Sequence, residues 1–444
     1  MSDGSRDVII VGGGIAGGAL AILLARSGID VLVLEKQAAY RDRVRGEYLA
    51  PWGAADAARN GLLDTLLEVE HTSVVRYKTP YDEVYDPAEA QARRHDMTRL
   101  HAEAPGALDL SHPATCERLV ESAAAAGAEV VRDVSDLTVT ANGRMAVRYV
   151  ADARQVERAC RLLVGADGRA STVRHQLEVP LHQAPARTYG AGLLVDGVVR
   201  WPTDTCAVGT EGDLNFYVYP RHGTAARLYL FHDARQGRRF TGARAAAEFL
   251  EAFRFACLPG SEEFVAARPI GPCASFPMND AWVDSAVIAD GAVLVGDAAG
   301  YSDPIIGQGL SLALRDACQL AALLVSSGDW SAAGLRSYAE ARTERLRRLR
   351  FVAALVTDLR GTFGPEQRRR RRRAYDLFEA DPSSRLPVSA TAVGPERLPS
   401  SAFDEAAAAR ILGPAIREAA GNGAFTRGGG RGRCRDVGVP IGIG

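Results

Sequence analysis

The sequence reads Val8-Ile9-Ile10-Val11-Gly12-Gly13-Gly14-Ile15-Ala16-Gly17-Gly18 near its start, and this stretch decides the fold. A β-branched run leads into a glycine turn, and an apolar segment of helical length continues to Ala25. A second apolar run, Val31–Leu34, then ends at the acidic residue Glu35. A strand, a glycine turn, a helix and a second strand in this order predict a parallel βαβ unit.

Each glycine of the pattern Gly12-x-Gly14-x-x-Gly17 has its own physical role. Gly12 allows a tight turn, Gly14 lets the backbone approach a pyrophosphate, and Gly17 lets helix and strand pack closely. The helix start directs unpaired N–H groups and the positive end of its dipole toward the phosphates. Glu35 lies at about the expected spacing of 20 residues, where a carboxylate accepts hydrogen bonds from an adenosine ribose. The unit predicts a dinucleotide site, the alternative being a turn without ligand, and its residues are Gly12, Gly14, Ile15, Ala16, Gly17, Glu35 and Lys36.

Length, charge and cysteine usage restrict the class of protein. The 444 residues carry 53 Lys and Arg against 54 Asp and Glu, a formal net charge of -1. This balance points to no nucleic-acid partner, and the length suffices for two or three domains. The seven cysteines are scattered without a Cys-x-x-Cys pair, which favours reduced thiols over a metal site or disulfides. The apolar start lacks a basic leader and is interrupted by glycines, so we expect a cytoplasmic protein with no membrane span.

Two later segments repeat the pattern of a buried strand, a Gly-Asp turn and a helix. The first reads Leu162-Leu163-Val164-Gly165-Ala166-Asp167-Gly168 and continues to Ser171-Thr172-Val173-Arg174. The second reads Val293-Leu294-Val295-Gly296-Asp297-Ala298-Ala299, and Gly307-Gln308-Gly309-Leu310 starts a helix that continues to Leu324. We expect both strands to join the sheet of the βαβ unit. The chain is therefore predicted to be α/β, with a Rossmann-like nucleotide-binding domain that is discontinuous in sequence.

Residues 180–268 have a different pattern, in which strand-like pieces alternate with polar turns. This pattern predicts an inserted antiparallel sheet, which either forms the floor of a substrate pocket or is purely structural. The predicted nucleotide-binding domain comprises residues 1–71, 109–179 and 269–330. Residues 72–108 are predicted as an excursion on the substrate side, and residues 180–268 as the substrate-binding domain.

Arginines dominate the C-terminal part of the chain. A pair of helices is expected over about 332–359, and Arg368–Arg373 form a run of six arginines. Such a run is either a solvated basic surface or a contact for an anionic substrate, partner or membrane. Residues 331–420 are therefore predicted as a C-terminal helical region, and the Gly- and Arg-rich residues 421–444 as a disordered tail.

The three motifs resemble, in their order along the chain, those of single-component FAD-dependent monooxygenases of the para-hydroxybenzoate hydroxylase fold. The resemblance covers about residues 8–330 and implies that the first motif holds the adenosine half of FAD. It implies that Asp297 hydrogen-bonds the ribityl chain, and that Asp167 with Gly168 supports the cofactor or the path of NAD(P)H. The remaining residues that it places at the flavin half of the cofactor are Gly296, Pro304, Gly307, Gln308, Gly309 and Leu310. There the glycines let backbone N–H groups approach, and a helix start stabilises negative charge on the reduced flavin.

Some positions depart from the pattern of the relatives or are ambiguous. Arg45 occupies the place of a loop arginine near the flavin, and with Pro304 it is a candidate residue near the reacting atoms. From its own residues, this loop suits either phosphate and flavin contacts or solvent exposure. His112 stands where relatives carry an arginine or glutamine, and is either a flavin contact or a loop histidine, while Tyr301 replaces a common histidine. The candidate bases on predicted strands, each of which also suits packing, are Tyr217, Tyr219 and His232.

By this resemblance the chain uses FAD, NADPH or NADH, and O2 to hydroxylate or epoxidise an aromatic or polycyclic small molecule through a flavin C4a-hydroperoxide. The lack of a second Gly-x-Gly-x-x-Gly unit for NAD(P)H favours this group over two-domain reductases. A reductase of the geranylgeranyl reductase type or a flavin halogenase shares the scaffold, although the Trp-x-Trp-x-Ile-Pro stretch of halogenases is absent. A non-enzymatic FAD-binding redox sensor is the third alternative. The sequence predicts no particular oligomeric state.

Overall fold

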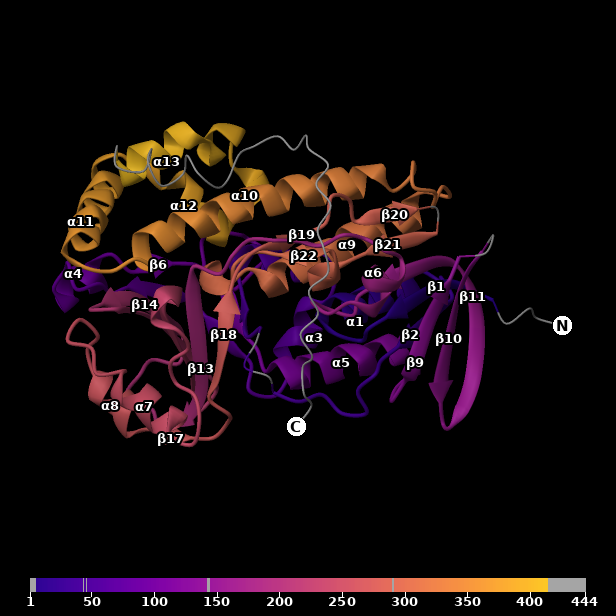
Figure 1. Ribbon diagram of the computed structural model, residues 1–444, viewed down its shortest axis with the longest axis horizontal. Coiled ribbons are helices and arrows are strands. Elements are labelled where there is room, and N and C mark those ends of the chain that lie inside the picture. Colours follow the sequence, from indigo (N-terminus) through magenta and orange to yellow (C-terminus); the bar gives the residue numbers. More distant parts are fainter. Residues whose placement is uncertain (1–4, 43, 45, 142–143, 290, 414–444) are drawn as a thin grey trace, which may run out of the picture.

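A computed structural model describes residues 5–42, 44, 46–141, 144–289 and 291–413. A layered α/β region lies at one end of the molecule and an antiparallel sheet at the other, and a long helix connects them along one side (Figure 1). The expected turn at Asn142-Gly143 and the expected tail at 421–444 lie outside the described residues.

The α/β region is built on an eight-stranded sheet with the order β20-β21-β11-β1-β2-β8, extended from β11 by β10 and β9. Strand β1 pairs in parallel with both β2 and β11, and β21 pairs in parallel with β11. The three motif-bearing strands therefore lie side by side, which confirms the discontinuous Rossmann-like fold. The strands of this sheet are β1 (Arg6–Val11), β2 (Val31–Leu34), β8 (Glu129–Val131), β9 (Ser135–Thr140), β10 (Met145–Ala151), β11 (Arg154–Gly165), β20 (Val287–Ala289) and β21 (Ala292–Leu294).

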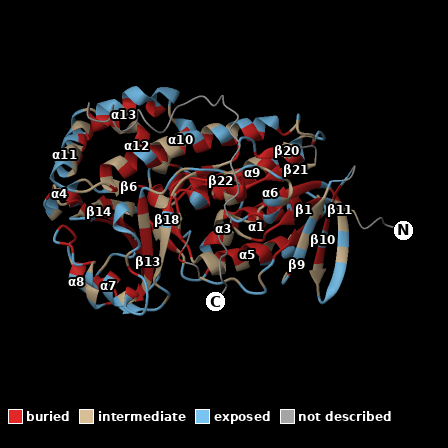
Figure 2. Ribbon diagram, viewed as in Figure 1, coloured by how far each residue is buried: buried red, intermediate tan, exposed pale blue. Residues whose placement is uncertain are grey.

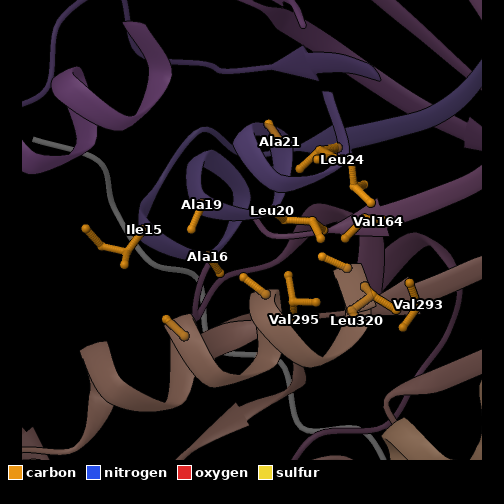
Figure 3. Close-up of a cluster of buried hydrophobic side chains, with 14 of the residues drawn as sticks. Ile15, Ala16, Ala19, Leu20, Ala21, Leu24, Val164, Val293, Val295 and Leu320 are labelled. Carbon is orange, nitrogen blue, oxygen red and sulfur yellow. The ribbon is translucent and has the colours of Figure 1, made fainter. Parts of the chain in front are cut away.

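Three helices cover this sheet: α1 (Ile15–Arg26), α5 (His112–Ala125) and α9 (Gly309–Ser326). Helix α1 is apolar around its circumference because it packs on the sheet as well as against α5 and α9. Figure 3 shows Leu20 of α1, Val164 of β11 and Leu320 of α9 meeting in one core. By length and mean hydropathy α9 could span a membrane, but 61% of it is buried inside the fold, as expected of a core helix.

The antiparallel sheet has the order β17-β13-β16-β15-β14-β5-β6, and β18 pairs with β13. Strands β5 and β6 come from the segment 72–108, so this excursion adds to the edge of the inserted sheet. Strand β18 lies beyond residue 268. The strands are β5 (Tyr77–Pro80), β6 (His95–Asp96), β13 (Thr188–Asp196), β14 (Thr205–Glu211), β15 (Leu214–Pro220), β16 (Ala226–Asp233), β17 (Arg268–Pro269) and β18 (Ala274–Met278).

The two faces of this sheet have different partners. Phe216 on one face packs against Phe253 and Phe255, beside the short helices α7 (Ala245–Glu251) and α8 (Ser261–Ala266). Tyr217 and its neighbours on the other face pack toward the α/β region, against a 3₁₀ turn η3 (Pro304–Ile306). The strand β13 between these layers is largely buried (Figure 2). The second face therefore borders the motif-bearing loops.

The remaining elements are short strands and helices around these two layers. Two of the sheets are three-stranded, with the orders β3-β7-β4 and β12-β19-β22. Their strands are β3 (Tyr48–Leu49), β4 (Ser73–Val75), β7 (Ala107–Asp109), β12 (His182–Gln183), β19 (Ala281–Trp282) and β22 (Gly300–Tyr301). The short helical segments are α2 (Pro51–Arg59), α3 (Leu63–Leu67), α4 (Pro87–Ala92), α6 (Thr172–Gln176), η1 (Ala234–Gln236) and η2 (Gly296–Ala299).

The C-terminal region is helical, with one difference from expectation. The expected helix pair at 332–359 is a single 25-residue helix, α10 (Arg336–Arg360), because no glycine or proline interrupts residues 336–360. It runs along the α/β region to the antiparallel sheet (Figure 1). The helices that follow are α11 (Pro365–Ala380), η4 (Pro382–Arg385), α12 (Leu386–Val393), η5 (Pro395–Arg397), η6 (Ser400–Phe403) and α13 (Glu405–Leu412).

Several arginines of this region are buried, so a purely solvated basic surface is wrong for them. In the run of six, Arg371 is fully buried, with its Nε 3.1 Å from Asp82 Oδ2 and its Nη2 2.6 Å from Glu83 Oε1. Arg368 of the same run is half-exposed. Acidic residues that are remote in sequence therefore compensate the buried charge.

The Asp316 carboxylate on α9 holds α10 against the third motif. Its Oδ2 accepts hydrogen bonds from Gly296 N (2.9 Å) and Arg342 Nε (2.7 Å), and its Oδ1 lies 2.8 Å from Arg345 Nη1. Arg342 also donates to the carbonyl oxygens of Gly296, Ala299 and Gly300. All three charged side chains are buried, so Asp316 compensates the charge of both arginines, and Glu396 also pairs with Arg345.

We expect Asp316→Ala to lower the free energy of unfolding by about 3–5 kcal/mol, because it leaves the buried Arg342 without its carboxylate and Arg345 with Glu396 alone. Chemical denaturation checks this. The matched control is Glu157→Ala, which removes the carboxylate of the exposed Arg148–Glu157 pair and should cost below about 1 kcal/mol. Equal losses in the two variants would contradict the role given to Asp316.

Candidate functional site

The glycine turn brings the first motif into backbone contact with the second. A Cβ atom built on Gly17 would lie 1.9 Å from Gly12 O, and one on Gly12 would lie 2.5 Å from Ala166 O. Gly12 also has a φ of +104°, which L side chains rarely adopt. The fold itself therefore requires these two glycines, whether or not a ligand binds.

At two other predicted glycines, no neighbouring atom of the protein excludes a side chain. A Cβ on Gly14 or on Gly309 would meet no atom within 4 Å. Gly14 is the N-cap of α1 and Gly309 is the first residue of α9, so each leaves open space at a helix start. Such ends present unpaired N–H groups and a positive dipole end, which suit a phosphate or a reduced flavin. The residues present thus fit the two halves of an FAD molecule.

Glu35 lies directly beside the glycine turn. Its buried carboxylate accepts hydrogen bonds from Gly13 N (2.7 Å) and Gln37 N (2.8 Å). Tyr40 donates its hydroxyl to Gly13 O (2.8 Å) from the same side. Since a carboxylate has about four acceptor positions, Glu35 keeps capacity for a ribose hydroxyl, and its predicted role remains a prediction.

Asp167 of the second motif forms its hydrogen bonds with neighbouring residues of the protein. Its carboxylate accepts hydrogen bonds from Ser171 Oγ (2.5 Å) and from Thr172 N (2.6 Å), and so caps the start of α6. Gly168, with a φ of +77°, forms the turn between them. The structure gives this pair the role of fixing the loop, and a direct cofactor contact stays a prediction.

The third motif touches both others. A Cβ on Gly296 would lie 3.2 Å from Ala16 Cβ, so the first and third motifs meet at the start of α1. Asp297 Oδ2 accepts a hydrogen bond from Arg169 Nε of the second motif (3.1 Å). The Asp297 side chain is 32% exposed and accessible to a ligand, as its predicted contact with a ribityl chain requires.

The loop before α9 is held rigidly by its neighbours. Gln308 accepts a hydrogen bond from Trp52 Nε1 (2.7 Å) and donates one to Ile306 O (2.7 Å). Its amide group therefore stabilises the loop. Tyr217 of β15 donates its hydroxyl to Ile305 O. Asp303 Oδ1 accepts from Ile305 N, and burial raises the pKa of Asp303 to about 7. Pro304 and Leu310 lie at either end of this fixed loop.

His112 lies next to the start of α9. A Cβ built on Gly46 would lie 3.1 Å from His112 Cδ2 and 3.3 Å from Leu310 Cδ2. The side chains of His112 and Leu310 therefore both lie close to Gly46. This arrangement places His112 beside the predicted flavin site, and its contact with a flavin stays a prediction. Arg45, the neighbouring candidate, lies outside the described residues.

An aromatic wall faces this loop, and it consists of Tyr217, Tyr219 and Phe231 on the antiparallel sheet and Tyr48 on β3. The rings of Tyr48 and Tyr219 lie 5.2 Å apart, and those of Tyr217 and Phe231 lie 4.8 Å apart. The Tyr219 hydroxyl lies 3.7 Å from a Cβ built on Gly307, so the wall reaches the start of α9. Burial raises the pKa of Tyr217 and of Tyr219, which keeps both hydroxyls protonated and unsuited to act as a base at neutral pH.

His232, the third candidate base, does not belong to this wall. Its ring stacks on Tyr189 and makes an edge contact with Phe240, which belongs to the core on the other side of the sheet. It packs there because strand residues alternate between the two faces.

Sequence reasoning missed a buried group of charges behind the wall. Arg227 Nε lies 3.0 Å from Glu47 Oε1, and Arg221 Nε lies 3.3 Å from Asp109 Oδ2. Tyr229 donates its hydroxyl to Glu47. Burial raises the pKa of Asp109 to about 7. The two arginines at the turn between apolar strands were the only signal, and their acidic partners are more than 100 residues away in sequence.

Comparisons with known proteins agree with this geometry. A family model described as FAD binding domain matches residues 5–351. Squalene epoxidase erg1 of Aspergillus fumigatus is 25% identical over 325 residues, which are 72% of this chain and 66% of that protein. The alignment thus covers just under two thirds of that relative's length.

Solved structures show the same fold. p-Nitrophenol 4-monooxygenase PnpA from Pseudomonas putida superposes with a TM-score of 0.72 at 18% identity, covering 85% of this chain and 94% of that one. The flavin-dependent halogenase CmlS superposes with a TM-score of 0.70 at 18% identity, covering 94% of this chain and 78% of that one. At such identities the likeness concerns the fold alone.

Substitution of the two kinds of glycine should affect stability and FAD binding differently. Gly14→Ala should change the free energy of unfolding by less than about 1 kcal/mol, yet weaken FAD binding about tenfold or more, because its methyl group occupies open space at a helix start. Gly17→Ala should lower the free energy of unfolding by about 1–3 kcal/mol or more, through its clash with Gly12 O. Denaturation and titration of the apoprotein with FAD check both. Unchanged FAD affinity in Gly14→Ala would contradict the site.

Proposed function

This chain belongs to the FAD binding domain family, and we propose that it is a monooxygenase acting on an aromatic or polycyclic small molecule. FAD is its cofactor, and NADPH or NADH would supply the electrons. The observation that carries the proposal is the meeting of two features. An aromatic wall contacts the loop before α9, and the start of that helix leaves open space at Gly309.

The chain's own residues would bind the cofactor along the line of the three motifs. Gly14 and the start of α1 would hold the pyrophosphate, Glu35 the adenosine ribose, and Asp297 the ribityl chain. Gly309 and the start of α9 would face the flavin ring, where the helix dipole stabilises negative charge. The bound flavin supplies electron transfer from the nicotinamide and activation of O2.

The wall would position the substrate and exclude water. Tyr48 and Tyr219 would offer ring surfaces on which a flat aromatic molecule stacks, and the protonated Tyr219 hydroxyl would serve as a hydrogen-bond donor. The fixed loop Pro304–Leu310 would keep the reacting carbon at a constant distance from the flavin, as efficient transfer requires. No residue of the wall is suited to take a proton from the substrate at neutral pH.

The substrates of the similar proteins do not identify the substrate of this chain. Squalene epoxidase acts, by its name, on squalene, and PnpA on p-nitrophenol. The side chains that shape a pocket on a β-sheet differ between proteins of one fold, so a shared fold does not transfer a substrate.

The test is incorporation of ¹⁸O from labelled O2 by the FAD-loaded protein with NADPH or NADH. Hydroxynaphthalenes, hydroxybiphenyls and polycyclic phenols are the first substrates to offer. We expect one labelled oxygen atom in the product and NAD(P)H oxidation that rises with the substrate. The Gly14→Ala variant at equal protein concentration is the control, and it should lose turnover in proportion to its FAD content.

A product that gains hydrogen without labelled oxygen would identify a reductase and overturn the proposal. If chloride or bromide is added and a halogen atom replaces a ring hydrogen in an NAD(P)H-dependent reaction, the protein is a halogenase instead.

A further inference from the structure

Two largely buried carboxyl groups lie together at the start of the loop before α9. Asp303 is 6% exposed and directly precedes Pro304, and its backbone N–H donates to Asp280 Oδ1 (2.7 Å). Asp280 belongs to the turn between β18 and β19. Burial raises the pKa of Asp280 to about 6 and that of Asp303 to about 7, and the charge of Asp280 contributes to the second shift. Asp303 is therefore partly protonated near neutral pH.

The cations that face Asp303 are engaged with other carboxylates. Among the residues that the structure describes, no Lys, Arg or His nitrogen lies within ion-pair distance of either of the two carboxyl groups. Arg169 and Arg187 lower the pKa of Asp303 from further away, and they pair with Asp297 and Asp358 respectively. Their charges oppose the upward shift of the Asp303 pKa without cancelling it.

The cation that faces Asp280 is Arg350 of α10. Its guanidinium carbon lies 3.3 Å from the centre of the Trp282 ring, in a cation–π contact. Its charge likewise opposes the upward shift of the Asp280 pKa without cancelling it. Both carboxyl groups thus lack the direct ion pair that Asp316 forms with Arg342 Nε (2.7 Å).

Capping of the turn η3 does not require an acid at position 303. Asp303 Oδ1 accepts a hydrogen bond from Ile305 N (2.9 Å), and a serine or asparagine would cap this N–H group without burying a charge. Asp303 Oδ2 accepts no hydrogen bond from a described residue, and it retains contact with solvent. One oxygen of the carboxylate therefore remains available to a ligand.

The Asp303 carboxyl group lies where the aromatic wall meets the loop. Tyr217 of the wall donates its hydroxyl to Ile305 O. Burial is the main cause of the raised pKa of Tyr217, and the nearby charge of Asp303 contributes to it. The next residue, Pro304, is the candidate that the sequence places near the reacting atoms. A carboxyl group with a shifted pKa beside such a surface is typical of a catalytic acid or base.

We propose that Asp303 is the catalytic base of the proposed function and takes the proton of a substrate hydroxyl group. Asp303 Oδ2 would accept this proton while the electron pair stays on the substrate oxygen, which makes the aromatic ring more nucleophilic. When the product forms, the proton returns from Asp303 to the same oxygen, and the carboxylate is regenerated. This inference rests on the proposed function and names a catalytic residue for it.

The first experiment compares two probes, 4-hydroxybiphenyl and 4-methoxybiphenyl, of which only the first carries a hydroxyl proton. Binding to the FAD-loaded protein is followed by the change in flavin absorbance. Since the pKa of Asp303 is raised to about 7, its carboxylate forms as the pH rises through this value. We expect the hydroxyl probe to be preferred about tenfold at about pH 8, where a charged acceptor binds the hydroxyl proton, and about twofold or less at about pH 5.

The variant Asp303→Asn tests the residue itself. Its amide oxygen can still cap Ile305 N, but the side chain cannot ionise. The preference for the hydroxyl probe should then be the same at both pH values, with an unchanged FAD content. If the wild-type preference does not change with pH, or if Asp303→Asn retains the change, the proposal is overturned.

Two further variants shift the pKa of Asp303 without altering its side chain. Asp280→Asn removes a negative charge, so the pH at which the preference appears should fall. Arg187→Gln removes a positive charge, so this pH should rise. Shifts in these opposite directions report the ionisation of Asp303, which a purely structural role would not produce. Shifts in the same direction, or no shift in either variant, would contradict the proposal.

The second measurement is the pH dependence of turnover with a hydroxylated substrate. The wild-type kcat should rise with pH through about 7, as the carboxylate forms, and then level off. Asp303→Asn should lower kcat by about 10²–10⁴-fold, as expected for loss of a general base. An unchanged kcat in this variant would overturn the proposal.

Probe binding needs neither NAD(P)H nor O2, so it separates this inference from the proposed function. A pH-dependent preference that Asp303→Asn abolishes, in a protein that incorporates no labelled oxygen, would support Asp303 as the proton acceptor and refute the monooxygenase. Labelled oxygen in a product, without a pH-dependent preference, would do the reverse.

Discussion

Backbone contact between three remote segments is the constraint on which this structure depends. A side chain at Gly17 would occupy the position of Gly12 O, one at Gly12 would clash with Ala166 O, and Gly296 lies against Ala16. The three motifs can therefore meet only because glycine stands at these points. The Asp316 carboxylate extends the same assembly to the C-terminal helix by holding Gly296 N together with Arg342 and Arg345. The site is thus built on parts of the fold that cannot move independently.

Much of this fold could be predicted because its signals are local. The βαβ unit at 8–35, the return strands near 162–165 and 292–295, and the inserted sheet each have a periodicity that a short window reveals. The C-terminal arginines could not be assigned in this way. Whether Arg371 is solvated or buried depends on Asp82 and Glu83, which lie almost 300 residues earlier. Composition alone does not reveal such pairing.

Some features of the candidate site could likewise be predicted from local motifs, and others could not. Sequence reasoning predicted cofactor roles for Gly14, Glu35, Asp297 and Gly309, since each belongs to a motif with a known spacing, and these roles stay predictions. It could not separate glycines that the fold requires from those that leave room for a ligand, because that distinction needs the neighbouring atoms. Together, the open helix starts and the aromatic wall form the proposed site for a flat aromatic substrate beside a flavin.

The most direct test of this account is a crystal structure of the protein with bound FAD. We predict the pyrophosphate at Gly14 and the start of α1, and the flavin ring at Gly309 with one face toward Tyr48 and Tyr219. A flavin ring bound elsewhere, with the wall still packed on the loop before α9, would contradict the central claim. The fold would then hold its cofactor by the first motif alone, and the wall would be structural.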